Sequence, residues 1–126
     1  MNHRAKLISC VAISGAVGLA VSAAWTPAVA VSIAGPACWI RQSSAWFCFY
    51  CALAYYLMAL RSLPFVARNF FGPAAGFLDG MGLWLIASAL LAIPWRWLWS
   101  PSSHVALWRV PLGLLISIVP PLGLIG

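Results

Sequence analysis

Long stretches without a charged side chain constrain this chain more than any other feature. No Asp, Glu, Lys or Arg interrupts residues 7–40, 42–60, 80–95 or 110–126. A membrane-spanning helix needs about 20 predominantly apolar residues to cross a hydrocarbon core about 30 Å thick. Only 6% of the residues are charged and 64% are hydrophobic, whereas about a quarter of the residues of a soluble domain are charged. The sequence therefore predicts an integral membrane protein of the all-α class.

The apolar stretches divide into five predicted segments of one membrane domain, residues 1–126. Thr26-Pro27 offers an N-cap followed by a proline at the first helical position, and so divides the first stretch. The second segment is short and contains Gly35-Pro36, so it is either a crossing helix or a re-entrant segment. Pro94 is expected to kink or end the fourth. We expect a polytopic transmembrane helical bundle of four to five helices, at about residues 7–25, 27–40, 43–60, 74–99 and 105–126.

The first segment also resembles a signal peptide, because a basic start precedes it and Ala28-Val29-Ala30 offers a cleavage pattern. Its apolar run is longer than the roughly 7 to 15 residues of a signal sequence, which favours an uncleaved helix.

The charge distribution predicts an orientation. The formal charge of +6 comes from seven Lys and Arg against one acid, and the basic residues are scattered singly. A nucleic-acid surface needs a basic patch, so no direct nucleic-acid binding is expected. If the second segment crosses, one side carries Arg4, Lys6, Arg41, Arg96 and Arg109, and the other carries Arg61 and Arg68. If it does not cross, the two groups are Arg4, Lys6, Arg61 and Arg68 against Arg41, Arg96 and Arg109. The first arrangement is more asymmetric and predicts a cytoplasmic N-terminus, because basic loops stay in the cytoplasm.

Aromatic residues suggest where the membrane surface lies. Tryptophans recur near the predicted segment ends, among them Trp95, Trp97 and Trp99, as interfacial anchors do. The connector 61–73 carries Arg68 among phenylalanines and has the amphipathic character of a segment at the interface.

Asp79 is the only carboxylate side chain and the one candidate for an intramembrane polar site. An ionisable group at membrane depth is costly and therefore suggests a function, such as cation binding or proton relay. The interpretation we favour places Asp79 in the first turns of the fourth helix, where the helix dipole favours an acid, because Gly72-Pro73 marks the helix start.

A four-residue glycine spacing predicts a helix-packing site at Gly76 and Gly80. Gly72 shares the spacing, but Pro73 limits its part. Glycines on one helix face let a neighbouring backbone approach closely. Gly15 and Gly18 are expected to act more weakly in the first helix.

No catalytic constellation is recognisable. Cys48 and Cys51 have CxxC spacing but lie in an apolar segment without a second pair. A single acid excludes a two-carboxylate mechanism. We therefore predict no catalytic, cofactor-binding or metal-binding residue.

Four short stretches are distinctive: Ala54-Tyr55-Tyr56-Leu57, Phe71-Gly72-Pro73, Arg109-Val110-Pro111-Leu112 and residues 119–126. Together they resemble the N-terminal membrane region of TraB-type conjugal transfer proteins. Those proteins are similar to apolipoprotein N-acyltransferases, in which membrane helices surround a nitrilase-like domain. The resemblance covers essentially the whole chain, through short apolar motifs of low specificity.

The resemblance implies a truncated chain, because the sequence ends in an apolar stretch and the Glu-Lys-Cys catalytic set of that superfamily belongs to the absent nitrilase-like domain. No catalytic residue is carried over. The implied function is an anchor in plasmid conjugation at the bacterial inner membrane, with the lipid bilayer and other conjugation or membrane-complex subunits as partners. The alternative is a complete small membrane protein: a holin-like pore former, a small transporter or a structural subunit.

Overall fold

The computed structural model describes residues 3–22, 35–36, 38–40, 42–72, 75–100, 109–113 and 115–116. Its described residues form helices and no strands, which confirms the all-α prediction for that part of the chain. Short helical stretches lie at 35–36, 38–40, 109–113 and 115–116. The longer helices are α1 (His3–Ser22), α3 (Ala45–Ala59), α4 (Leu63–Phe71) and α5 (Ala75–Leu98).

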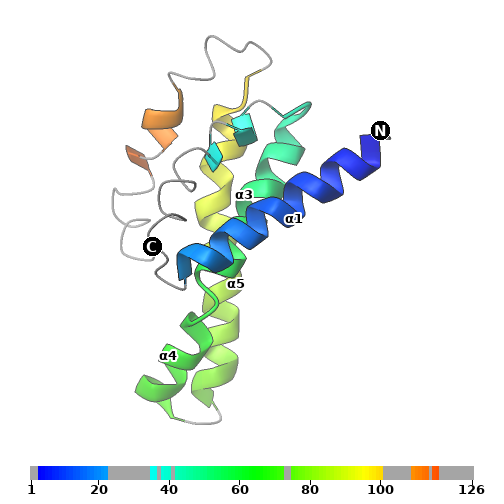
Figure 1. The fold of residues 1–126 in the computed structure, drawn as a ribbon. Helices are drawn as coiled ribbons and strands as arrows, with labels where there is room; N and C mark the ends of the chain where they lie inside the picture. The colour runs from blue at the N-terminus through cyan, green and yellow to red at the C-terminus, as the bar shows by residue number, and fades with distance from the viewer. Residues whose placement is uncertain are drawn as a thin grey trace.

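The helices form a small bundle in which α3 and α5 run side by side in opposite directions, while α1 lies obliquely across α3 (Figure 1). Two interhelical hydrogen bonds fix the antiparallel register. The Cys48 thiol donates to the Trp95 carbonyl at 3.1 Å, and the Trp84 indole donates to the Leu57 carbonyl at 2.9 Å. The start of α3 therefore lies beside the end of α5. We call this end of the bundle the tryptophan end, after Trp46, Trp95, Trp97 and Trp99.

Local chemistry sets the boundaries of α3 and α4. Ser44 is the N-cap of α3, with extended backbone, and its hydroxyl accepts from the Phe47 amide at 3.3 Å. A bend of 47° separates α3 from α4. Gly72 ends α4 with a φ of 97°, a conformation that favours glycine. The predicted interfacial connector thus contains a helix, and α4 lies along the first part of α5 (Figure 1).

Side chains from neighbouring segments satisfy carbonyls at the helix ends. The last four carbonyls of a helix have no intrahelical donor, and inside a membrane no water replaces it. Besides the Cys48 and Trp84 bonds, Arg109 donates to the carbonyls of Leu98 and Trp99 at 3.2 and 3.1 Å. These contacts join α3, α5 and the 109–113 stretch.

Fewer of the described helices are long enough to cross a membrane than the four to five that we expected. In the described part of the chain, one helix, Gly76–Leu98, is long and apolar enough to cross a bilayer. The bent pair of α3 and α4 passes the same test when both count as one span. With its 15 residues, α3 alone rises only about 22 Å. The predicted segments at 27–40 and 105–126 lie largely outside the described residues.

Pro94 does not end the fourth predicted segment. The helix continues through it to Leu98, although a proline removes one backbone donor. Pro94 itself is buried.

The core lies at the tryptophan end, where α1, α3, α5 and residues 38–40 meet. Its largest fully buried side chain is Trp95. The other buried members of this cluster are Trp39, Ile40, Cys48, Cys51, Ala52 and Ala92. By contrast, large apolar side chains along the outer faces of α4 and α5 are exposed, including Phe70, Leu78 and Ile86.

Candidate functional site

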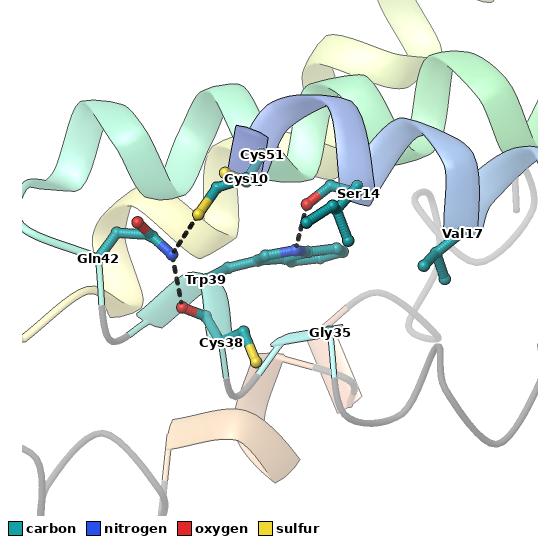
Figure 2. A pocket seen from close by; sticks show the side chains of 9 residues that line it. Cys10, Ser14, Val17, Gly35, Cys38, Trp39, Gln42 and Cys51 are labelled. Carbon is teal, nitrogen blue, oxygen red and sulfur yellow. Dashed lines mark hydrogen bonds between the residues drawn. The ribbon is translucent and has the colours of Figure 1, made fainter. Parts of the chain in front are cut away.

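A cavity of about 240 Å³ lies beside Trp39, and we call it the Trp39 cavity (Figure 2). It lies between α1, α3 and the 35–42 region. Its lining residues are Cys10, Ile13, Ser14, Val17, Gly35, Cys38, Trp39, Gln42 and Cys51.

Trp39 is the centre of the cavity wall, and a hydrogen bond with α1 holds it in place. Its indole nitrogen donates to the buried Ser14 hydroxyl at 3.0 Å. The ring also lies 5.3 Å from that of Tyr55 and 5.5 Å from that of Trp95, the latter edge-on. Such aromatic pairs contribute roughly 0.5–1.5 kcal/mol beyond burial. One residue thus links α1, α3 and α5.

Gln42 closes one side of the cavity. Its side-chain amide donates to the Cys38 carbonyl at 3.1 Å and lies 3.8 Å from the Cys10 sulfur (Figure 2). Its own backbone carbonyl accepts from the Trp99 indole at 2.8 Å. Gln42 therefore joins α1 to the end of α5.

The chemistry of the cavity is that of an apolar recess with a few polar groups. Its polar side chains are three thiols, one hydroxyl and one amide, and the hydroxyl already accepts from Trp39. Among the described residues, no group of three or more His, Cys, Asp or Glu is placed to hold a metal ion. Cys48 of the CxxC pair lies outside the cavity and donates its thiol hydrogen to α5.

Asp79 lies away from the Trp39 cavity. It occupies the second turn of α5, near the opposite end from the tryptophan end, and its side chain is exposed. The candidate polar site and the cavity are therefore separate features.

Gly76 and Gly80 face α4. A Cβ at position 80 would lie 2.7 Å from the Ala67 Cβ and 2.8 Å from the Pro64 Cα, and one at position 76 would lie 2.9 Å from the Ala67 carbonyl oxygen. Real Cβ atoms do not approach backbone this closely. The absence of side chains thus lets α4 and α5 come together.

Gly80→Ala is expected to loosen α4 from α5. Overpacking costs about 1–3 kcal/mol, so α4 should open more often. Trypsin cleavage after the exposed Arg68 should then accelerate, because cleavage within a helix requires local unfolding. Gly82→Ala is the matched control, since nothing lies within 4 Å of a Cβ there. Equal cleavage rates in the two variants would contradict the packing role.

Three tertiary contacts, one in the Trp39 cavity and two elsewhere in the bundle, do not follow from the sequence. The Trp39–Ser14 hydrogen bond joins residues 25 positions apart, and no spacing rule relates them. Gly18, expected to act weakly, lies so close to Tyr55 that a Cβ would collide with its carbonyl group. Arg96 lies over the Trp46 ring, although the two residues are 50 positions apart in the sequence.

Comparison with known proteins adds no relative: no family model, no curated protein and no solved structure matches the chain.

Proposed function

We propose that this protein is a multi-pass helical anchor and scaffold of the bacterial inner membrane, with its N-terminus in the cytoplasm. The observation that carries the proposal is the apolar outer surface of α5. Leu78 is 73% exposed, Ile86 60% and Trp97 76%, along a helix long enough to cross a bilayer. Soluble proteins seldom expose large contiguous apolar surfaces, whereas lipid covers them without cost.

The helix directions support the proposed orientation. Arg96 and Arg109 lie at the tryptophan end, whereas Arg61 and Arg68 lie toward the end where α4 packs on α5 (Figure 1). Both charge distributions predicted from the sequence contain this separation. The start of α1, which carries Arg4 and Lys6, also lies toward the tryptophan end (Figure 1), and only the more asymmetric distribution places these residues there. This arrangement supports a cytoplasmic tryptophan end and an external α4.

Membrane insertion and orientation are tested together. The full chain expressed in a bacterium should stay in the membrane pellet after alkaline carbonate extraction. Reporter fusions within residues 61–73 should be active on the periplasmic side, and fusions at the N-terminus on the cytoplasmic side. Release by carbonate would refute insertion, and a cytoplasmic signal from the 61–73 fusion would reverse the orientation.

We also propose, from the resemblance to TraB-type proteins, that the anchor serves plasmid conjugation. Deleting its gene from a conjugative donor should lower the transfer frequency, and a copy supplied in trans should restore it. Unchanged transfer would argue for the alternatives, of which a pore former is recognised by dye leakage from liposomes that contain the purified chain.

A further inference from the structure

Arg96 and Trp46 meet at the tryptophan end, where α3 begins and α5 ends. The Arg96 guanidinium carbon lies over the Trp46 ring, 4.0 Å from its centroid. This distance is well within the range of a cation–π contact, which is strongest with tryptophan. The contact holds a long, flexible side chain in one place on the surface.

Arg96 has no acidic side chain beside it in the described part of the chain. The one acidic side chain, Asp79, lies near the opposite end of α5, roughly 25 Å away at about 1.5 Å per residue. Among the described residues, none accepts a hydrogen bond from the Arg96 guanidinium, which is exposed. Its N–H donors are therefore available to an external anion.

Neighbouring cations are arranged differently. Arg109 is half-buried and donates to the carbonyls of Leu98 and Trp99. Arg68 is exposed like Arg96, but it lies in α4, toward the other end of the bundle. Arg96 thus differs from both of these arginines by the combination of exposure and an aromatic support.

The depth of Arg96 in a bilayer follows from the aromatic residues beside it. Trp46 is 51% exposed and Trp97 is 76% exposed. Exposed tryptophans of membrane proteins lie at the level of the lipid headgroups. A guanidinium at this level faces phosphate groups, for which its planar set of donors is well suited.

We propose that Arg96, supported by Trp46, is a binding site for the phosphate of an anionic phospholipid headgroup in the leaflet that faces the tryptophan end. This inference rests on the proposed function, because it requires the chain to be inserted in a bilayer. The positive charge of the chain, +6 with one acid, favours anionic over zwitterionic lipid. In addition to this general attraction, the contact with Trp46 holds the Arg96 guanidinium in one position.

The test uses the full chain in phosphatidylcholine bilayers with spin-labelled phosphatidylglycerol or spin-labelled phosphatidylcholine. Electron paramagnetic resonance gives the relative association constant of the two lipids. We expect Arg96→Gln to lower the preference for phosphatidylglycerol about fivefold, the equivalent of about 1 kcal/mol per basic residue at a membrane surface. The matched control Arg68→Gln, which removes the same charge from an exposed arginine without a ring, should lower it less.

Two further variants distinguish a specific lipid-binding site from diffuse electrostatic attraction. Trp46→Leu keeps every charge but removes the aromatic support, and should lower the preference about twofold, within the range of an exposed cation–π contact. Arg96→Lys keeps the charge but loses the planar donor set. Its preference for phosphatidylglycerol should lie between those of the wild type and Arg96→Gln.

The outcomes are distinguishable. Equal effects of Arg96→Gln and Arg68→Gln, or no effect of Trp46→Leu, would overturn the site and leave only diffuse attraction. Carbonate extraction of each variant reports insertion separately. A wild-type chain that fails to insert would refute the proposed function, whereas an inserted chain without lipid preference would refute the lipid site alone.

Discussion

Trp95→Ala is expected to lower the free energy of unfolding by about 3 kcal/mol, because Trp95 is the largest fully buried side chain among the described residues. Truncating a buried tryptophan costs about 3–5 kcal/mol in soluble proteins. For a chain inserted in a bilayer, as we propose, the lower end applies, because lipid tails already provide an apolar environment and the loss is mainly of packing contacts. Trp95 is 0% exposed, lies edge-on 5.5 Å from Trp39, and donates to the Tyr56 hydroxyl at 3.2 Å.

Its matched control lies two residues further along the same helix. Trp97 is 76% exposed, so Trp97→Ala removes the same side chain from an exposed position and should change stability by less than about 1 kcal/mol. The measurement is equilibrium unfolding in mixed detergent micelles, followed by circular dichroism. Similar losses in both variants would mean that α5 does not bury Trp95 against α3.

Trp95→Phe separates the hydrogen bond from the packing. Phenylalanine keeps most of the aromatic contact but loses the donor to Tyr56. The expected loss is about 1 kcal/mol for the bond, in addition to the smaller ring. A loss as large as that of Trp95→Ala would place most of the effect in the polar contact.

Gly18→Val is expected to separate α1 from α3. A Cβ at this position would collide with the Tyr55 carbonyl group, and the Tyr55 Cα would lie 3.1 Å from it. Because the obstacle is helix backbone, no side-chain rotation relieves it. The cost should reach or exceed the upper part of the roughly 1–3 kcal/mol of overpacking. The Trp39–Ser14 hydrogen bond should weaken with it, since Ser14 lies one turn earlier on α1.

The control is Gly82→Val, at a glycine without a neighbour within 4 Å. Both substitutions place a β-branched residue in a helix, so the small propensity cost is shared. Gly15→Ala is an intermediate case, because its Cβ would meet Met58 at an ordinary 3.6 Å. In equilibrium unfolding in mixed micelles, we expect Gly18→Val to have a much lower free energy of unfolding than Gly82→Val or Gly15→Ala. Equal stability of Gly18→Val and Gly82→Val would show that α1 does not rest on α3 at Tyr55.

Parts of the fold follow from local sequence. The uncharged apolar run predicts a helix at about residues 43–60, and α3 spans Ala45–Ala59. Gly72 before Pro73 predicts an interruption, and the chain turns there with a positive φ. Such features are recognisable because apolar runs and glycine turns depend on consecutive residues.

Helix continuity was harder to predict at Pro94. A proline removes a donor from its own helix, which favours a break, yet α5 continues to Leu98. At this end of α5, Cys48 donates to the Trp95 carbonyl and Arg109 to the Leu98 carbonyl. These bonds do not replace the one that Pro94 removes, which would reach the Leu90 carbonyl. They hold the part of α5 that follows Pro94 against distant segments, and no window of sequence around Pro94 contains them.

By itself, the sequence determined that the chain is strongly apolar and that the part of it which the structure describes is helical, because composition and the lengths of uncharged stretches are properties of the linear chain. It also indicated the four-residue spacing of Gly76 and Gly80. Only the tertiary structure decided that Gly18 makes the closest approach, that Trp39 binds Ser14, and that Arg96 lies over Trp46. The physical reason is that these contacts depend on where helices cross, and the crossing positions result from packing between segments far apart along the chain.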